Sequence, residues 1–326
     1  MRVRARMSVM CMWNNLKKTK FCILFKSGIN SVKPKYDKQL RTSIHGKTIL
    51  ITGASSGIGL TTAYRLADAG AHVLLVARTK ETLDEVKAEI EAKGGKASVF
   101  PCDLNDLDAI DAVSQEILSS IDHIDILVNN AGRSIRRAVH ESTDRFHDFE
   151  RTMQLNYFGA IRLVMNMLPH MIERRAGHII NISSIGVLAN ATRFSAYVAS
   201  KAALDAFSRC LSAEVHSHKI AITSIYMPLV RTPMIAPTKI YNYVPTLSPE
   251  EAADLVAYAI IKRPKKIATN LGRLASITYA IAPDINNKLM SIGYNLFPSS
   301  SASIGKQEKL NWVQKAYARL FPGEHW

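Results

Sequence analysis

From residue 47 onward, short apolar stretches alternate with longer amphipathic ones, and this alternation is the strongest constraint on the fold. The apolar stretches predict strands at 48–52, 72–77, 98–101, 124–129, 178–183, 220–226 and 266–270. The amphipathic stretches predict helices at 58–69, 80–93, 104–120, 145–174 and 194–216, with another starting at 249. Strands that alternate with helices form a parallel sheet covered on both faces. The predicted fold class is therefore α/β, with a doubly wound parallel sheet.

The domain organisation follows from where this pattern starts and stops. Residues 46–271 are predicted to form one catalytic domain, and residues 272–326 a helical C-terminal extension with no linker between them. Residues 1–45 form a basic arm, which we expect to be disordered or dispensable. An interfacial anchor and an upstream start codon are the alternatives for this arm.

The basic charge of the chain is concentrated at its N-terminus. The net charge is +15, and residues 1–41 carry eleven Lys and Arg against one acid, or +10 of that total. The rest is an ordinary solvated surface, so no nucleic-acid partner is predicted. Four cysteines without metal-ligand spacing indicate reduced thiols, and no metal site is predicted.

A glycine-rich segment lies between the first predicted strand and the first predicted helix. Helix amides at this position point at a bound phosphate, and glycines let a pyrophosphate approach. The same letters contain G-x-S-x-G, the pattern of a hydrolase nucleophile elbow, although an elbow would leave the last glycine unexplained. We expect a Rossmann-type dinucleotide site. Its predicted contacts here are Thr52, Gly53, Ser55, Ser56, Gly57, Ile58 and Gly59.

The end of the second strand indicates which dinucleotide binds. An acid there would hold the ribose of NAD, whereas a guanidinium would hold the 2′-phosphate of NADP. Here Ala77 is followed by Arg78, which favours NADPH over NADH, the alternative being an arginine merely exposed at a helix start. After the third strand, Asp103 and Leu104 are predicted cofactor contacts. Asp103 could accept a bond from the adenine, or it could equally cap the next helix.

Two more loops end strands at the same edge of the sheet. The fourth strand is followed by three predicted cofactor contacts, Asn129, Ala131 and Gly132. Taken alone, this motif indicates only a turn. The loop after the sixth strand supplies three further predicted cofactor contacts, Pro228, Val230 and Thr232.

Tyr197 and Lys201 are four residues apart on a predicted helix, so their side chains leave the same face. An adjacent ammonium stabilises a phenolate and lowers the pKa of the tyrosine from its usual value of about 10. The pair could also be a chance surface pair. Ser184 ends the fifth strand, where its hydroxyl could donate to a substrate carbonyl. Asn156 lies inside a helix, where an asparagine calls for a hydrogen-bond partner.

In their order and spacing, these motifs resemble the short-chain dehydrogenase/reductase family from residue 47 to about 235. The resemblance implies that Ser184 orients the carbonyl and that Tyr197 is the acid. Lys201 would lower the pKa of Tyr197 and hold the ribose, and Asn156 would support a proton-relay water. The family usually has Pro-Gly where this chain has Pro228-Leu229. Because leucine is disfavoured at positive φ, we expect the loop over the nicotinamide to differ.

Segments 130–137, 184–193 and 321–326 further resemble the bacterial long-chain fatty acyl-CoA reductases of the wax-ester pathway. This implies NADPH-dependent reduction of long-chain acyl-CoA to fatty aldehyde with release of coenzyme A. We also expect a cytoplasmic homo-oligomer with peripheral contact at the inner membrane surface. The apolar C-terminal tail could form an acyl tunnel, pack a dimer or rest on a membrane surface. Two sets of cations could meet the coenzyme A phosphates or simply be solvated, namely Arg133, Arg136, Arg137 and Arg193, or Lys262, Arg263, Lys265 and Lys266.

Two other functions are compatible with the same residues. An NADP-dependent ketone or hydroxysteroid-type reductase would use them on a simpler carbonyl. A cofactor-sensing or membrane-surface binding protein would keep the nucleotide fold without turnover, although the intact Ser184, Tyr197 and Lys201 set argues against it.

Overall fold

The computed structural model describes residues 36–236 and 245–296. The chain divides into the units Met1–Ser43 and Ile44–Trp326, and the described part of the first unit is helical. The second unit contains the sheet and the site. The boundaries predicted at residues 45 and 271 stay predictions, and residues 297–326 of the predicted extension lie outside the described residues.

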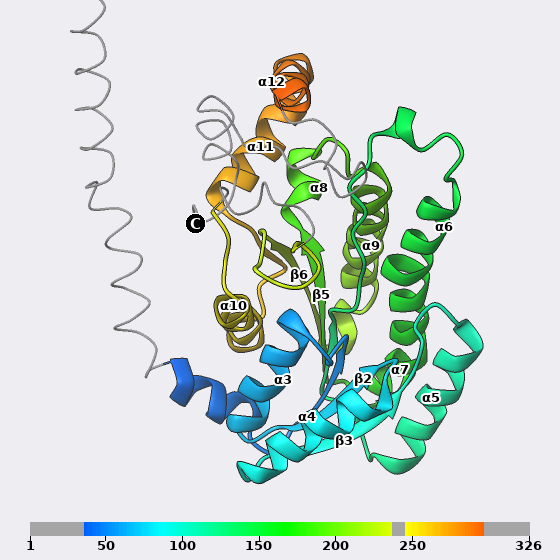
Figure 1. The fold of residues 1–326 in the computed structure, drawn as a ribbon. Coiled ribbons are helices and arrows are strands. Elements are labelled where there is room, and N and C mark those ends of the chain that lie inside the picture. Colours follow the sequence, from blue (N-terminus) through cyan, green and yellow to red (C-terminus); the bar gives the residue numbers. More distant parts are fainter. Residues whose placement is uncertain (1–35, 237–244, 297–326) are drawn as a thin grey trace, which may run out of the picture. The chain divides into compact units, whose positions relative to one another are not determined.

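Seven strands form one parallel sheet in the order β3-β2-β1-β4-β5-β6-β7 (Figure 1). The strands are β1 Thr48–Thr52, β2 His72–Ala77, β3 Lys96–Pro101, β4 Ile126–Asn129, β5 Gly177–Ser184, β6 Ile220–Met227 and β7 Lys266–Ile267. The chain first builds the sheet from β1 toward β3 and then returns to the other side of β1. The predicted fold class is confirmed, and this reversal between β1 and β4 is where such sheets bind ligands.

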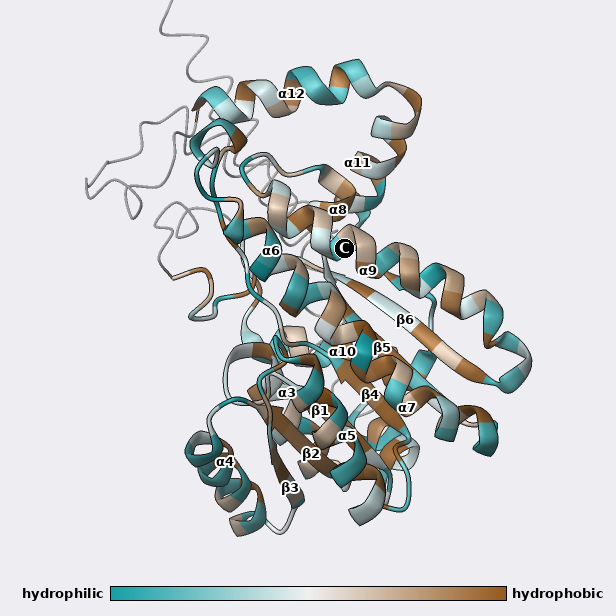
Figure 2. Ribbon diagram, turned by 90° about the vertical axis from the view of Figure 1, so that its right-hand side faces the viewer, coloured by the Kyte–Doolittle hydropathy of each residue, from teal (hydrophilic) through white to brown (hydrophobic). Residues whose placement is uncertain are grey.

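Helices cover both faces of the sheet. They are α3 Gly57–Asp68, α4 Lys80–Ala92, α5 Leu107–Ser120, α6 His147–Met153, α7 Ala160–Arg174, α8 Ile185–Ala189, α9 Ser195–Glu214, α10 Pro249–Lys262, α11 Asn270–Ile281 and α12 Pro283–Leu296. Helices α5, α7 and α9 share one hydrophobic core with the sheet, whereas α3 packs against α10. The strands are predominantly hydrophobic (Figure 2), and every residue of β1 and β5 is buried. Each fully buried aliphatic side chain contributes about 1.5–3 kcal/mol.

The helix predicted at 145–174 is interrupted by a π-helical segment, Gln154–Gly159, between α6 and α7. Gly159 allows this segment to pack closely, because a Cβ there would lie 2.2 Å from the Leu104 carbonyl oxygen. Such segments concentrate at functional sites. Asn156 lies inside this one.

Helix α8 was not predicted. The C-terminal helix α11 packs against it. A Cβ on Gly272 of α11 would lie 3.1 Å from Ile185 and 3.2 Å from Leu188 of α8. The absence of a side chain at Gly272 therefore lets α11 lie directly against these side chains of α8. No helix within residues 36–236 and 245–296 combines the length and apolar character needed to cross a membrane.

A buried histidine lies in the sheet outside the site. His178 on β5 places Nε2 2.9 Å from the Thr223 hydroxyl, which donates to the Pro264 carbonyl at 2.6 Å. Because the hydroxyl proton is used, His178 donates through Nε2, and its Nδ1 has no hydrogen-bond partner. Burial, followed by the charges of Arg263 and Lys47, lowers the pKa of His178 to about 3.

We expect the free energy of unfolding to fall as pH decreases from about 6.5 to about 3. In this window the unfolded chain binds a proton at His178 and the folded chain does not, so acid favours unfolding by up to a few kcal/mol. Urea unfolding at several pH values measures the slope. His178→Gln should reduce it, whereas His216→Gln at an exposed site should not. An unchanged slope in the His178 variant would show that other groups cause it.

Candidate active site

The loops after β1 and β4 are joined where the strand order reverses. The Thr52 hydroxyl accepts hydrogen bonds from the amides of Asn130 and Ala131 at 3.0 and 2.9 Å. In return, the Asn130 side chain donates to the Thr52 carbonyl at 2.9 Å. These bonds hold two walls of the ligand crevice in fixed positions.

The glycines of the first loop have steric and conformational roles. Gly53 and Gly57 have φ values of +66° and +55°, where glycine is favoured. A Cβ on Gly59 would lie 2.2 Å from the Gly53 carbonyl oxygen and 2.6 Å from Asn130 Nδ2. The nucleophile-elbow interpretation leaves Gly59 unexplained, whereas a closely packed phosphate loop requires it. The side chain of Ser56 at the N-cap makes no hydrogen bond to the first amides of α3.

The loop after β6 reaches the glycine-rich loop through Thr232, since a Cβ on Gly57 would lie 3.0 Å from its Cγ2. Leucine is disfavoured at positive φ, which led us to expect a different loop here, and Leu229 is not among the described residues with positive φ. Its carbonyl instead accepts from the Leu247 amide at 2.8 Å, and Val230 forms a parallel bridge with Leu247. Leu229 and Val230 are therefore held by pairing with Leu247 from another segment, and not in the turn that a glycine would make.

Arg78 is exposed directly after β2, where the cofactor phosphate was predicted. Arg78 interacts electrostatically with Arg133, which lies on the loop after β4. Burial lowers the pKa of Arg133, and the charges of Arg151 and Arg78 lower it further. This edge of the sheet is therefore cationic on both sides of the crevice.

Asp103 does not cap a helix, so that alternative is wrong. Helix α5 begins later, and Asp106 caps it by accepting from two backbone amides. The Asp103 carboxylate accepts from the amide and the side chain of Asn105 at 3.0 and 2.7 Å, and its side chain is exposed. Leu104 is buried, and its carbonyl lies against the π-helical segment.

Ser184 and Tyr197 meet where β5 ends and α9 begins. The Ser184 hydroxyl accepts from the Gly186 amide at 3.1 Å, so it also caps α8. Its side chain is hydrogen bonded to Tyr197. Burial raises the pKa of Tyr197, and the bond to Ser184 offsets part of that increase.

Lys201 is 3% exposed, and its ammonium donates to the Ile182 carbonyl at 2.8 Å. Burial lowers the pKa of Lys201 to about 8, so it remains mostly charged at neutral pH. The sequence led us to expect that Lys201 lowers the pKa of Tyr197. Burial raises the pKa of Tyr197 overall, and a lowering by Lys201 stays a prediction.

Asn156 is fully buried, and its side chain is fully engaged. Its Oδ1 accepts from the Arg133 amide at 2.8 Å, and its Nδ2 donates to the Arg133 carbonyl and the Ser200 hydroxyl, both at 2.9 Å. Asn156 therefore fixes the loop after β4 to α9. A relay water held by Asn156 stays a prediction.

Asn129 has its side chain in the interior, away from the crevice. Its Nδ2 donates to Asn181 Oδ1 at 2.9 Å, and Asn181 donates to the Ser208 hydroxyl at 2.8 Å. A cofactor contact by Asn129 would therefore use its backbone. Asn181, Ser200 and Ser208 were not predicted. A polar residue within the apolar β5 stretch was the available signal for Asn181.

The residues at this edge fit a bound NADPH. A glycine cradle that a Cβ would fill, a cation after β2 and a buried lysine one helical turn from Tyr197 match its diphosphate, 2′-phosphate and ribose. The predicted cofactor residues occupy strand ends and helix starts at this edge: Thr52, Gly53, Ser55, Ser56, Gly57, Ile58, Gly59, Arg78, Asp103, Leu104, Asn129, Ala131, Gly132, Tyr197, Lys201, Pro228, Val230 and Thr232.

The cysteines that the structure describes do not join this site. Cys102 is buried, and burial, then the nearby acids, raise the pKa of its thiol to about 11. Cys210 is exposed on α9. In the described part of the chain, no group of three His, Cys, Asp or Glu residues is placed to hold a metal ion.

Arg78→Ala should weaken NADPH binding at least about tenfold and leave NADH binding nearly unchanged, because only NADPH carries a phosphate for the guanidinium. Calorimetric titration with each nucleotide measures both constants. Lys80→Ala is the matched control, since Lys80 is an exposed cation two residues away that pairs with Asp84 at 2.6 Å. Equal losses for the two nucleotides would remove Arg78 from the phosphate site.

Comparison with known proteins places this site among related enzymes. A family model described as short chain dehydrogenase matches residues 47–240. A fatty acyl-CoA reductase of Acinetobacter baylyi is 80% identical over 90% of this chain and 99% of its own length. A fatty acyl-CoA reductase of Mycobacterium tuberculosis is 48% identical over 75% of this chain and 84% of its own.

Solved structures show the same architecture. A metagenomic short-chain oxidoreductase in complex with NADP is 31% identical, with a TM-score of 0.61 over 70% of this chain and 98% of its own. The family match covers most of the sheet region, and the related structure binds NADP. Both findings agree with the geometry of the site. The chain belongs to the short-chain dehydrogenase/reductase family.

Proposed function

We propose that the protein reduces long-chain fatty acyl-CoA to fatty aldehyde, with NADPH as the reductant and coenzyme A as the second product. The observation that carries this proposal is the 80% identity to a fatty acyl-CoA reductase across 99% of the length of that relative. The related structure with NADP and the exposed Arg78 support the choice of cofactor.

NADPH, when bound, supplies the hydride for the thioester carbon. The hydroxyls of Ser184 and Tyr197, already bonded to each other, would donate to the thioester oxygen as negative charge develops there. Collapse of this oxyanion breaks the carbon–sulfur bond, so that the thiolate leaves and takes up a proton. No acyl group is transferred to a side chain, and Cys102 and Cys210 have no part in the step.

The other predicted catalytic residues would position Ser184 and Tyr197 and return a proton to Tyr197. Lys201 would hold the cofactor ribose beside Tyr197. Asn156, through its bonds to Arg133 and Ser200, would keep the loop after β4 against α9. Asn156 would also support the proton-relay water.

The test measures NADPH oxidation and free thiol together, with palmitoyl-CoA as substrate and the product identified by gas chromatography. We expect equal amounts of thiol released and NADPH oxidised, with hexadecanal as product. Twice as much NADPH as thiol would show further reduction to the alcohol. NADPH oxidation on ketones, with no thiol from acyl-CoA, would overturn the proposal in favour of a ketone reductase.

We also propose that the enzyme works in the cytoplasm as a homo-oligomer, with peripheral contact at the inner membrane surface. Helices α11 and α12 expose large apolar side chains, among them Ile281 at 79% and Ile285 at 61%, and this supports contact with lipid. Liposome flotation and sedimentation measure the two properties separately. A monomer that stays with the soluble fraction would contradict both.

A further inference from the structure

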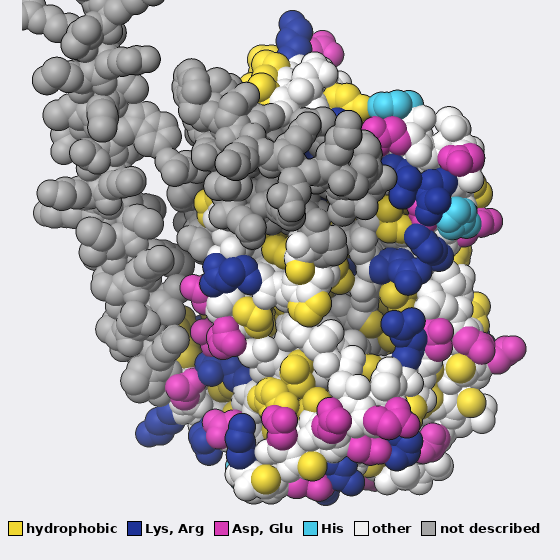
Figure 3. Space-filling model, in the orientation of Figure 1, with side chains coloured by type: hydrophobic (Ala, Val, Ile, Leu, Met, Phe, Trp, Pro, Cys, Tyr) yellow, Lys and Arg dark blue, Asp and Glu magenta, His cyan; other side chains and the backbone are white. Residues whose placement is uncertain are grey.

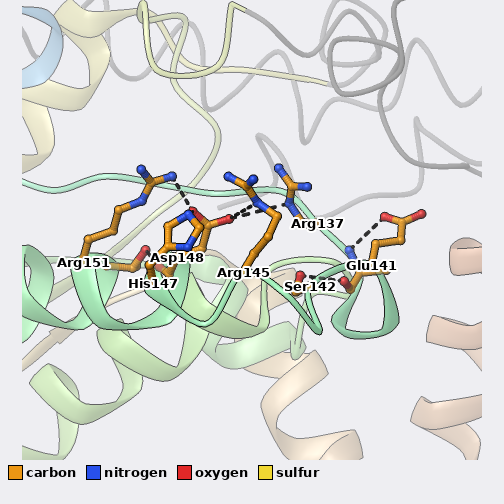
Figure 4. Close-up of polar contacts among 9 residues, drawn as sticks. Arg137, Glu141, Ser142, Arg145, His147, Asp148 and Arg151 are labelled. Atoms are coloured by element: carbon orange, nitrogen blue, oxygen red, sulfur yellow. Dashed lines mark hydrogen bonds and ion pairs between the residues drawn. The ribbon is translucent and has the colours of Figure 1, made fainter.

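Cationic side chains gather beside α6 on the face shown in Figure 3. At their centre lies Asp148, whose side chain is 2% exposed (Figure 4). Its Oδ2 is 3.1 Å from Nε of Arg145 and 3.7 Å from Nε of Arg137. Its Oδ1 pairs with Arg151 and lies 3.4 Å from Nε2 of His147. We call these five residues the arginine cluster.

The arginine cluster holds more positive charge than its one acid balances. Burial would raise the pKa of Asp148, but its bond to Arg145 and the charges of Arg151, Arg145 and His147 lower it overall, so the carboxylate is ionised at neutral pH. Three guanidinium groups and one carboxylate leave a net charge of +2, before any charge on His147. An ion network that served only to join α6 to the neighbouring loop would not need this excess.

The three guanidinium groups are ordered and yet reachable. Their side chains are 28% exposed for Arg137, 34% for Arg145 and 45% for Arg151. Each has five N–H donors, and one carboxylate can use only part of them. Because Asp148 already holds these long side chains, an arriving anion would lose less free energy in ordering them.

The cluster lies close to the catalytic residues. Helix α6 runs directly into the π-helical segment, and Asn156 follows Asp148 by eight residues, about 12 Å along the axis. On the other side, the Arg137 amide donates to the Arg193 carbonyl at 2.7 Å, and Arg193 precedes Tyr197 by four residues. A ligand bound at the cluster would therefore lie near the mouth of the active site but apart from the reacting carbonyl.

We propose that the arginine cluster binds the phosphate groups of the coenzyme A part of the substrate. The inference rests on the proposed function. Coenzyme A carries a diphosphate and a 3′-phosphate at the end of a long pantetheine arm, and guanidinium groups recognise phosphate oxygens with paired N–H donors. The arm separates these phosphates from the thioester, as the cluster is separated from Ser184 and Tyr197.

The assignment revises what the sequence suggested. Of the arginines singled out there for coenzyme A, only Arg137 belongs to the cluster. After burial, the charge of Arg151 in the cluster and then that of Arg78 lower the pKa of Arg133, so Arg133 interacts with both the cluster and the proposed NADPH phosphate site. The two phosphate-bearing ligands would thus bind at neighbouring groups of arginines.

The test uses the full chain with Arg145→Gln and Arg151→Gln combined. The matched control combines Arg209→Gln and Lys93→Gln, which remove two exposed positive charges, one on α9 and one at the C-terminal end of α4. The substrates are palmitoyl-CoA and S-palmitoyl pantetheine, a thioester without phosphates. Calorimetry measures the binding of free coenzyme A and of NADPH. Where the Gln variant does not fold, Arg145→Lys with Arg151→Lys replaces it, which keeps the charge and removes the paired donors.

We expect the cluster variant to raise the KM for palmitoyl-CoA and the Kd of coenzyme A about tenfold to a hundredfold, with kcat within about twofold. The KM for S-palmitoyl pantetheine and the Kd of NADPH should not change, and the control should behave as wild type. The Lys variant should lose part of the coenzyme A affinity. An equal rise in KM for both thioesters, or an unchanged Kd for coenzyme A, would overturn the assignment.

Two further outcomes identify other phosphate sources and would also overturn it. Weaker NADPH binding with normal coenzyme A binding would assign the cluster to the cofactor. Loss of binding to phosphatidylglycerol vesicles, but not of coenzyme A binding, would assign it to lipid headgroups, with phosphatidylcholine vesicles as the neutral reference. If wild type does not reduce palmitoyl-CoA, the proposed function fails, and the calorimetry still decides whether the cluster binds coenzyme A.

Discussion

Tyr197→Phe should lower kcat for acyl-CoA reduction by about a thousandfold or more while NADPH still binds with nearly normal affinity. The variant keeps the ring and removes the hydroxyl that bonds to Ser184 and would donate to the developing oxyanion. Removing a general acid or an oxyanion donor costs about 10²–10⁴ in rate. Turnover of palmitoyl-CoA and calorimetric titration of NADPH measure the two effects.

Tyr279→Phe is the matched control for this prediction. Tyr279 lies on α11, is 43% exposed and has no role in the proposed step. It should retain full activity. If the Tyr197 variant kept more than about a tenth of the wild-type rate, Tyr197 could not be the acid.

The structure also changes the reason for expecting an acid at this position. A lowered pKa would favour the phenolate, which suits the removal of a proton from an alcohol. A tyrosine with its usual pKa of about 10 is already protonated at neutral pH, and burial raises the pKa of Tyr197 further. A protonated phenol is the form that donates to an oxyanion, as the proposed reduction requires.

Gly59→Ala should abolish NADPH binding at micromolar concentrations, with an affinity loss of about a hundredfold. The new Cβ would lie 2.2 Å from the Gly53 carbonyl oxygen and 2.6 Å from Asn130 Nδ2, and neither group can move without disturbing the loops that hold the cofactor. Overpacking of this kind also lowers the free energy of unfolding by about 1–3 kcal/mol. Titration and urea unfolding measure the two losses.

Gly94→Ala separates this steric effect from ordinary backbone strain. Gly94 has a φ of +78°, but a Cβ there would meet no atom within 4 Å. The substitution should cost about 1–2 kcal/mol of stability and leave NADPH affinity unchanged. Normal NADPH binding by the Gly59 variant would mean that the glycine-rich loop is not the diphosphate site.

Most of the sheet could be predicted because each strand is a local apolar run and each crossover a local amphipathic one. The positions of Ser184 and Tyr197 at the edge of the sheet follow from that order of elements. The π-helical segment could not be predicted, because it depends on the Leu104 carbonyl packing against Gly159, which is distant in sequence. The same holds for the partners of Asn156.

The loop at Leu229 and the arginine cluster show two further reasons why sequence reasoning falls short. Leucine at position 229 indicates that the loop differs from the usual turn, but it does not indicate that Leu247 from another segment pairs with Leu229 and Val230. In the cluster, Arg137 and Arg151 come from either side of Asp148, and their convergence on one carboxylate is visible only in three dimensions.

The contact between α12 and the loop before α9 also affects the order in which the chain can finish folding. The guanidinium carbon of Arg193 lies 4.0 Å from the ring centroid of Tyr294, and the Tyr294 carbonyl accepts from Arg193 at 3.3 Å. During synthesis from the N-terminus, Tyr294 leaves the ribosome 101 residues after Arg193. A nascent chain can therefore assemble its sheet, while the segment leading to Tyr197 gains this support only near the end of translation.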